Sequence, residues 1–365
     1  MAKRIILAIV AVIAAVLIAL AIYVAYLMTA YYRLDDSLPL ETQHNEATAS
    51  LVRNYSAGEK LVAVTANLGF GAYLPDFDFF MDGGSGSVAE SAATVTESIE
   101  GSAAAIKKLR PDFVLFQEVD TDADRSHHVD ELALLQKEFP SYASVFAQNY
   151  DSPFLAWPPM APHGASKAGI ATFSHFTVDS SLRRSLPISD SLTKFLDLDR
   201  CYAITRFDGP DGRQLVVMNV HLSAYGADES IMAAQRSMLY QDMAREYEAG
   251  NYVIVGGDFN HDMLGDSNGF FGNATQTEES WAKPFDFASI PEGFRAPMRE
   301  AFEAGTFDSA ATCRDAGRPY DGTNDRWVMD TFLCSDNVRV ESCETLDLDF
   351  AYSDHNPVVL TFSLA

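Results

Sequence analysis

The N-terminal region contains an apolar run over residues 5–27, "IILAIVAVIAAVLIALAIYVAYL", in which no side chain is charged. At about 1.5 Å per residue, a helix of these 23 residues is longer than the ~30 Å hydrocarbon core of a bilayer. A cleavable signal peptide has an apolar region of only ~7–15 residues, so the length favours a retained anchor over residues 1–33. Lys3 and Arg4 precede the run and Arg33 follows it. This bias predicts a single-pass protein of the cell membrane, with a cytoplasmic N-terminus and an extracytoplasmic domain.

Beyond the apolar run, strand-like and helix-like patterns alternate. Short runs rich in β-branched and apolar residues predict buried strands over residues 61–68, 112–119, 214–222, 251–259 and 357–364. Longer amphipathic stretches predict helices over residues 88–109, 126–139 and 228–248, with Ser126 as the cap of the second. The mixture predicts one α/β domain over residues 60–365.

Three segments do not follow these patterns. Residues 34–59 are polar and aperiodic, which predicts a juxtamembrane linker. A loop over residues 151–169 is rich in proline, and residues 261–325 are irregular and rich in glycine and aromatic side chains. These segments are therefore expected to connect elements of the domain or to lie outside it.

The charge is unevenly distributed. The whole chain has 26 basic and 51 acidic residues, a net charge of −25, and the part after residue 34 has 23 against 51, or −28. Such a surface repels polyanions, although salt screens the repulsion beyond about 8 Å. The charge therefore disfavours a non-specific nucleic-acid-binding protein, but it does not exclude a nuclease whose cleft is neutralised locally by a metal ion.

The four cysteines leave the redox state open. Cys201, Cys313, Cys334 and Cys343 fit no metal-binding spacing such as C-x-x-C. In an oxidising compartment they could form up to two disulfides, in any of three pairings. Four buried thiols are an equally good interpretation.

Six clusters of polar residues stand where apolar runs end. They are Asn67, Gln117 with Glu118, Asn219 with His221, Asp258 with Asn260, Asp330, and Asp354 with His355 in "YSDHNPV". Taken singly, each has an ordinary structural explanation, such as a turn for Asn67 or a half-buried histidine for His221. Because strand ends at one edge of a sheet can converge on a single crevice, their combination in this order predicts one site.

These residue types suit the hydrolysis of a phosphoester. Mg²⁺ prefers oxygen ligands, which Glu118, the amide of Asn67 and Asp354 would supply; Mn²⁺ and Ca²⁺ are alternatives. A histidine such as His355 can take a proton from water at neutral pH once a carboxylate fixes its tautomer, and Asp330 or Asp258 could be that carboxylate. Asn219, His221 and Asn260 are candidates to bind the phosphate oxygens, and His221 could also protonate the leaving group.

The order and spacing of these clusters resemble the endonuclease/exonuclease/phosphatase superfamily over about residues 60–365. The Asn-x-His-Leu form of the third cluster, Asn219 to Leu222, is similar to the deoxyribonuclease and sphingomyelinase branches. The resemblance implies a four-layer α/β/β/α sandwich, with two mixed β-sheets packed face to face, helices outside them and a metal site at one end. It also leaves the base open, because some branches assign that role to the aspartate equivalent to Asp258.

Three functions remain as hypotheses. The first is a membrane-anchored, divalent-metal-dependent phosphoesterase acting on lipid head groups or small phosphoesters, and the second is a membrane-tethered nuclease. The third is a catalytically inactive cell-surface binding module, which the presence of all the expected residues disfavours. No protein partner is predicted. Weaker phosphate-binding candidates, each with a structural explanation of its own, are Tyr150, Lys167, Arg200, Arg314 and Arg318.

Overall fold

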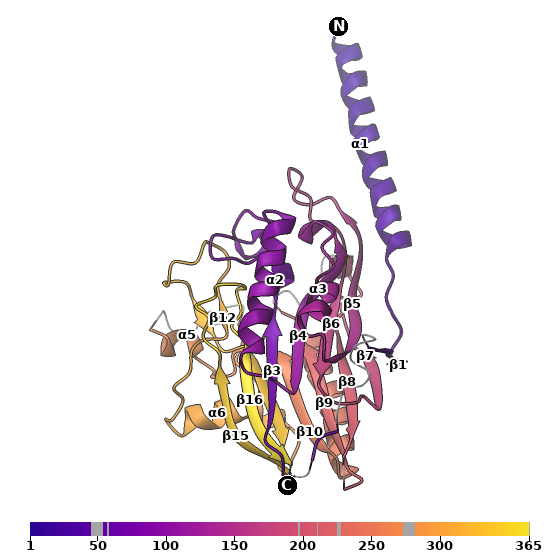
Figure 1. Cartoon of the computed structure of the whole chain (residues 1–365). Coiled ribbons are helices and arrows are strands. Elements are labelled where there is room, and N and C mark those ends of the chain that lie inside the picture. The colour runs from indigo at the N-terminus through magenta and orange to yellow at the C-terminus, as the bar shows by residue number, and fades with distance from the viewer. Residues whose placement is uncertain are drawn as a thin grey trace.

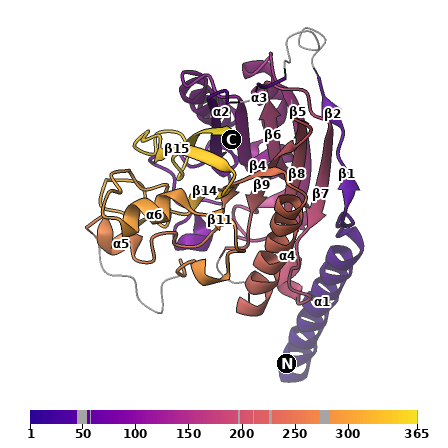
Figure 2. The same cartoon turned by 90° about the horizontal axis from the view of Figure 1, so that it is seen from below.

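Two seven-stranded mixed sheets pack face to face, and helices cover their outer faces (Figures 1 and 2). The computed structural model describes residues 1–44, 54–56, 58–195, 198–209, 211–224, 228–272 and 282–364. This arrangement confirms the predicted α/β/β/α sandwich. Residues 45–53 and 57 of the predicted linker, and residues 273–281 of the predicted irregular stretch, lie outside the described residues.

The first sheet has the strand order β1-β7-β8-β9-β10-β14-β11. Its strands are β1 (Leu38–Pro39), β7 (Ser180–Ser185), β8 (Cys201–Asp208), β9 (Gln214–His221), β10 (Tyr252–Asp258), β14 (Asp330–Ser335) and β11 (Phe294–Arg295). β9 and β10 run parallel, whereas β14 runs antiparallel to β10 and places Asp330 opposite Asp258. Helix α4 (Glu229–Glu248) covers the outer face of this sheet (Figure 2).

The second sheet has the order β15-β16-β3-β4-β6-β5-β2. Its strands are β15 (Val338–Thr345), β16 (Val358–Leu364), β3 (Leu61–Asn67), β4 (Phe113–Ala123), β6 (Gly164–Ser174), β5 (Ala143–Leu155) and β2 (Thr42–Gln43). Helices α2 (Ala92–Lys107) and α3 (Glu131–Glu138) cover its outer face (Figure 1). The shorter elements α5 (Ser267–Phe270), α6 (Pro297–Glu303), β12 (Cys313–Arg314) and β13 (Arg326–Trp327) flank the sandwich.

The core between the sheets explains the continuous apolar runs in the sequence. Every residue of β10 is buried, because one face of the strand meets the second sheet and the other meets α4. Gly256 allows the sheets to approach closely at this point, since a Cβ there would lie 2.4 Å from the Phe332 ring and 2.8 Å from Leu115. The central strands are thereby fixed relative to one another at the edge where the polar clusters lie.

Helix α1 (Ala2–Ala30) projects away from the sandwich, and none of its residues is buried (Figure 1). It is long and apolar enough to cross a membrane, a test that a signal sequence also passes. The chain that follows it runs along the domain, where β1 pairs with β7 and β2 pairs with β5. This part of the predicted linker therefore adds one short strand to each sheet.

Two local predictions were wrong, and one strand was missed. Helix α3 begins at Glu131, and its cap is Asp130, whose carboxylate accepts a hydrogen bond from Ala133 N at 2.9 Å, rather than Ser126. β5 and β6 extend into the predicted loop at 151–169, because their paired backbones continue the ladder to Leu155 and Gly164. β15 was not predicted, since its alternation of exposed and half-buried residues leaves no continuous apolar run.

Candidate active site

A cavity of about 330 Å³ opens at the end of the sandwich where β3, β9 and β10 finish, and Glu118, in the middle of β4, lines it. The predicted residues that line it are Glu118, His221, Asp258, Asn260, Asp354 and His355. Asn67 and Asp330 lie directly behind this lining and are hydrogen-bonded to it. Eight of the nine predicted site residues are thus brought together, and Asn219 is the exception.

The side chain of Asn67 joins the two sheets at the cavity. Its Nδ2 donates to Glu118 Oε1 at 3.2 Å and to Asp258 Oδ2 at 2.9 Å, and its Oδ1 accepts from Gly69 N at 3.0 Å. Asn67 and Glu118 belong to the second sheet, whereas Asp258 ends β10 of the first. The amide therefore holds carboxylates from opposite sheets beside each other.

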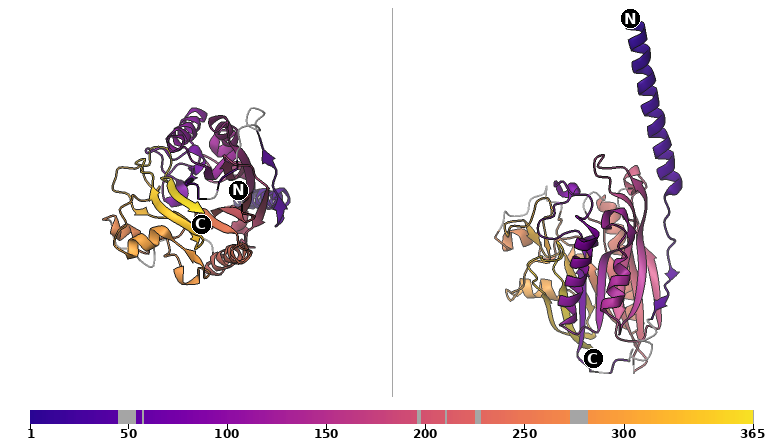
Figure 3. Two further views of the ribbon diagram at one scale, coloured as in Figure 1. Left: turned by 60° about the horizontal axis from the view of Figure 1, so that its bottom comes forward. Right: turned by 45° about the horizontal axis from the view of Figure 1, so that its top comes forward.

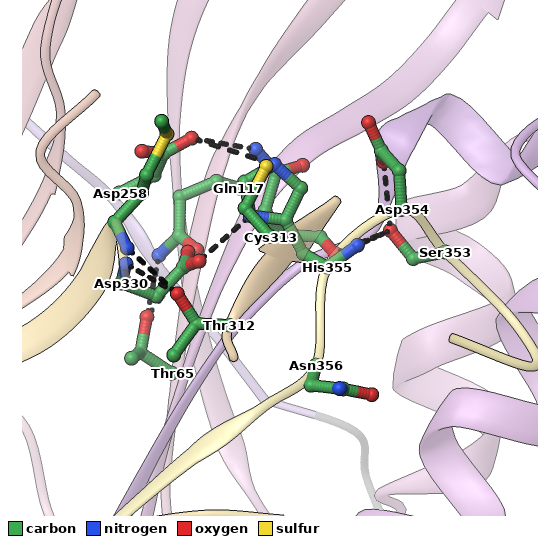
Figure 4. A network of polar contacts seen from close by, with 12 residues as sticks. Thr65, Gln117, Asp258, Thr312, Cys313, Asp330, Ser353, Asp354, His355 and Asn356 are labelled. Carbon is green, nitrogen blue, oxygen red and sulfur yellow. Dashed lines mark hydrogen bonds and ion pairs between the residues drawn. The ribbon is translucent and has the colours of Figure 1, made fainter. Parts of the chain in front are cut away.

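His355 and Asp330 form a charge-assisted pair on the floor of the cavity (Figure 4). The distance from His355 Nδ1 to Asp330 Oδ2 is 2.7 Å, and Nε2 lies 4.0 Å from Asp258 Oδ2. Ser353 Oγ accepts from His355 N at 3.1 Å and donates to Asn67 O at 2.9 Å. The backbone of the "SDH" turn is therefore fixed to the end of β3, and Asp330 directs Nε2 of the imidazole toward the carboxylates of the site.

His221 approaches the same carboxylates from β9. Its Nε2 lies 3.7 Å from Asp258 Oδ2 and 3.9 Å from Glu118 Oε1. Burial, together with the positive charges of Arg200, His355 and Arg125, holds the pKa of His221 well below its usual value. At neutral pH this imidazole is uncharged and has one N–H to donate.

Buried negative charge dominates the electrostatics of the site. Burial raises the pKa of Glu118, with the charge of Asp354 adding to the effect, and burial with the charge of Asp330 raises the pKa of Asp258 to about 6. Burial alone would lower the pKa of His355, but the negative charges of Asp330 and Asp354 outweigh it and raise the pKa well above its usual value. A bound cation would relieve this repulsion.

The donor set fits a hard divalent cation. Carboxylate oxygens of Glu118, Asp258 and Asp354 face the cavity, and oxygen ligands of this kind are preferred by Mg²⁺. One ligand atom from each of Asp258, Asp330 and His355 lies within 4.8 Å of the others. Within this trio, His355 Nδ1 and Asp330 Oδ2 are already paired with each other.

Two site residues have backbone conformations that are rare outside glycine. Glu118 has φ 53° and Asn260 has φ 51°, values that cost of the order of 1–3 kcal/mol each. Asn260 N donates to Asp258 Oδ1 at 2.8 Å, and its Nδ2 donates to Leu222 O at 2.9 Å. The turn after β10 therefore stabilises the Asp258 carboxylate and leaves the second amide hydrogen of Asn260 for another acceptor.

Asn219 lies between the sheets and does not line the cavity. Its Oδ1 accepts from Gln117 Nε2 at 2.8 Å, and its Nδ2 donates to the carbonyl oxygens of Ala171 at 3.0 Å and Phe116 at 3.2 Å. The side chain is fully buried, and the second sheet occupies both ends of the amide. The structure thus gives Asn219 a role in joining the sheets instead of the predicted contact with phosphate.

The weaker candidates divide into two groups. Tyr150, Arg200 and Arg314 line the cavity, whereas Lys167 is exposed on β6, and Arg318 is exposed and paired with Asp321 at 2.7 Å. Sequence reasoning missed a further lining residue, Arg125, which makes two hydrogen bonds to Asp120 at 2.7 and 2.9 Å and lies 4.1 Å above the Phe70 ring. Arg125 stands in no recognisable motif, so only the fold reveals it.

All four cysteines lie in the described part of the chain and are free thiols. Cys201, Cys313 and Cys334 are buried, and Cys343 is partly exposed. Burial raises the pKa of Cys201 to about 11 and that of Cys313 to about 12, which keeps both protonated. The sequence left open either disulfides or free thiols, and the structure has free thiols at all four positions.

The fold and the site together define a DNase I-like class of hydrolase. A model of the Endonuclease/Exonuclease/phosphatase family matches residues 64–355, and the chain belongs to this family. Its members hydrolyse phosphoester bonds and use divalent metal ions, typically Mg²⁺. Comparison of the sequence with curated proteins gives no significant match.

Solved structures share the fold at low sequence identity. An endonuclease/exonuclease/phosphatase from Beutenbergia cavernae aligns with a TM-score of 0.57 and 18% identity, over 84% of this chain and 72% of that one. TDP2 from D. rerio, complexed with a single-strand DNA product, gives 0.53 and 15%, over 84% and 99%. The human Nocturnin catalytic domain, with a bound sulfate anion, gives 0.53 and 19%, over 89% and 98%. These similarities establish the fold alone.

The position of Asn219 predicts that its loss weakens the fold rather than the site. Asn219→Ala removes the buried hydrogen bonds to Gln117 and to the carbonyl groups of Phe116 and Ala171, so the free energy of unfolding should fall by about 1–3 kcal/mol in urea denaturation. The exposed Asn54→Ala is the control and should be neutral. An unchanged stability with weakened binding of inorganic phosphate would restore the phosphate-contact interpretation.

The His355–Asp330 pair makes a prediction about titration. Asp330 stabilises the protonated imidazole, so Asp330→Asn should lower the pKa of His355 in the metal-free protein by about 1–3 units. NMR titration of the histidine Cε1 protons measures it, with His355→Gln assigning the signal and the exposed Asp325→Asn as the matched control. The same pKa in Asp330→Asn and in the wild type would show that the contact does not determine the charge of His355.

Proposed function

We propose that the protein is a membrane-anchored phosphoesterase that depends on a divalent metal ion. The observation that carries the proposal is the convergence of the His355–Asp330 pair, neutral His221 and the carboxylates of Glu118 and Asp258 on one cavity. Each role in phosphoester hydrolysis then has a residue at a suitable distance. The inactive-module hypothesis loses support, because none of these residues is replaced.

Glu118 and Asp354, with the amide oxygen of Asn67, would hold the cation. The Asn67 oxygen accepts from Gly69 N, but a carbonyl oxygen has two lone pairs and can still be a ligand. When bound, Mg²⁺ offsets negative charge on the phosphate, and Mn²⁺ or Ca²⁺ could occupy the same oxygen site.

His355 is the better candidate for the general base. Asp330 holds Nδ1 and directs Nε2 toward the site. The raised pKa of His355 comes from the neighbouring carboxylates, so a bound cation that offsets their charge would lower this pKa and leave Nε2 free to accept a proton from the attacking water. Asp258 competes for this role, but its two oxygens accept hydrogen bonds from Asn260 N and Asn67 Nδ2. Both oxygens of Asp258 are therefore engaged by donors, which leaves them less free than Nε2 of His355 to meet a water, although burial raises the pKa of Asp258 to about 6.

His221 and Asn260 are suited to the phosphate itself. Neutral His221 can donate one hydrogen bond to a non-bridging oxygen or to the leaving group, and Asn260 has one amide hydrogen left. A donor of this kind contributes roughly 3–4 kcal/mol to transition-state stabilisation. Arg200, whose Nη1 donates to Leu222 O at 2.9 Å, adds positive charge to the same wall of the cavity.

Membrane anchoring is part of the proposal. The length and composition of α1 support it, and the basic residues Lys3 and Arg4 favour a cytoplasmic N-terminus with the domain on the other side. The net charge of −25 favours lipid head groups or small phosphoesters over nucleic acid. The DNA product bound to TDP2 keeps nucleic acid as the alternative.

The metal requirement is tested with the full chain in detergent micelles. Hydrolysis of a bis-aryl phosphate should require Mg²⁺ or Mn²⁺ and stop on complete chelation, because the buried carboxylates cannot bind an anion alone. Glu118→Gln should lower kcat/KM at least about 100-fold, since even outer-shell changes cost 10–100-fold in metal affinity. The exposed Glu97→Gln is the matched control and should keep full activity.

His355→Ala tests the base. Loss of a general base lowers kcat by about 10²–10⁴-fold, and the exposed His128→Ala should not. Turnover that survives complete chelation would reject the metal mechanism. Full activity of His355→Ala would show that His355 is not the general base and would favour Asp258 in that role. Parallel assays on phospholipid, DNA and RNA identify the substrate class.

A further inference from the structure

We propose that the cavity opens toward the bilayer that anchors the protein, and that the substrate is a phosphoester of a lipid in that bilayer. The proposal rests on the phosphoesterase function above. Helix α1 projects from the same end of the sandwich at which the cavity loops lie, and the C-terminus lies at the opposite end (Figures 1 and 3). A domain held by this helix therefore presents the cavity end to the membrane.

Hydrogen bonds between α1 and the segment around Phe154 fix the position of this segment along the helix axis. Tyr23 Oη donates to Phe154 O at 3.0 Å and accepts from Ala156 N at 2.9 Å, and Tyr26 Oη accepts from Phe154 N at 3.0 Å. From Ile5 to Tyr23 a helix rises about 27 Å, close to the ~30 Å thickness of the hydrocarbon core. The end of β5 and the loop that follows it thus lie where the hydrocarbon ends and the head groups begin.

The composition of this loop matches that position. Residues 152–166 contain no aspartate, glutamate, lysine or arginine, although charged residues make up 21% of the chain. Trp157 is 60% exposed and Met160 is 96% exposed. Burial lowers the pKa of His163 to about 4, so the one titratable side chain of the stretch is neutral. Uncharged segments bearing tryptophan are typical of the membrane interface.

Exposed apolar side chains are concentrated at this end of the domain. Among the described residues that follow α1, six large apolar side chains are exposed: Tyr32, Met81, Phe154, Trp157, Met160 and Phe270. Tyr32 follows α1, Phe154 lies near the end of β5, Trp157 and Met160 lie on the loop that follows, and Met81 lines the cavity. Only Phe270, on α5 at the side of the sandwich, lies elsewhere (Figure 1). This apolar rim would be covered by the bilayer.

The rim is continuous with the wall of the cavity. Ser87 Oγ donates to Ala161 O at 2.6 Å, and His163 Nδ1 lies 2.7 Å from Ser87 O. The His163 ring contacts Phe79 and Phe80, with centroids 6.2 and 6.1 Å apart. Phe70, Tyr73, Phe79 and Met81 then continue the apolar surface into the cavity. The apolar part of a lipid could remain on this surface while its phosphate meets Glu118 and His355.

The opposite rim connects the cavity to the end of α1 directly. Lys194 lines the cavity, and its Nζ lies 5.3 Å from the centre of the Tyr31 ring, immediately after the helix. The Tyr31 ring also packs edge-on against Phe195 at 5.4 Å. A lysine beside the end of the membrane helix can attract an anionic head group. A long nucleic acid would instead have to enter between the domain and the bilayer.

The experiment uses the full chain in phosphatidylcholine nanodiscs that contain a sphingolipid, a phosphatidylglycerol or a phosphoinositide in turn. Trp157→Ser with Met160→Ser removes two interfacial side chains and leaves the catalytic residues intact. Turnover of the bilayer lipid should fall at least about tenfold, and that of a soluble bis-aryl phosphate should stay within about twofold. The matched control, Phe270→Ser, should change neither rate.

The outcomes separate this proposal from the phosphoesterase function. Equal lipid turnover in the double variant and the wild type overturns the inference alone. So does a wild type that hydrolyses the soluble phosphodiester but none of the bilayer lipids. Failure of the wild type on every substrate overturns both proposals.

Insertion of the loop is measured independently of activity. Brominated acyl chains should quench part of the tryptophan fluorescence of the wild type in nanodiscs, and this quenched part should be missing in Trp157→Phe. Equal quenching in the two proteins, or none in either, contradicts insertion of the loop.

Discussion

The structure depends on one constraint, the burial of several carboxylates at a single point between two sheets. Asn67 donates to Glu118 of its own sheet and to Asp258 of the other, so one amide sets the distance between the two negative charges. Asp330 and Asp354 add further negative charge, and the raised pKa values of Glu118 and Asp258 show that it is poorly compensated. Such an arrangement is unfavourable unless a cation or a proton shares it.

The neighbouring structure maintains this constraint at a cost in stability. Glu118 and Asn260 have strained backbones, and two imidazoles lie between the same carboxylates in different charge states. The His355 side chain is held by Asp330, whereas His221 is kept neutral by burial and by nearby cations. The two histidines therefore have opposite pKa shifts in one cavity, a difference that can give them different roles in acid–base chemistry.

Most of the site could be predicted because polar residues at strand ends have few structural uses in combination. Asn219 shows the limit of this reasoning. It lies two positions before His221 on the same face of β9, about 7 Å deeper between the sheets, so its amide meets the second sheet rather than the cavity. Arg125 could not be found, because its position depends on Asp120 and Phe70 and not on a local pattern. The sequence also could not relate α1 to the cavity, since the contacts of Tyr23 and Tyr26 span more than 120 positions.

Diffraction from crystals of the full chain soaked in Mn²⁺ tests the central claim most directly, because anomalous scattering locates the ion without any assay. We predict a peak among the carboxylates that line the cavity, within coordination distance of a Glu118 oxygen, and its loss in Glu118→Gln. A peak elsewhere, or a cavity without a peak at saturating Mn²⁺, would contradict the account.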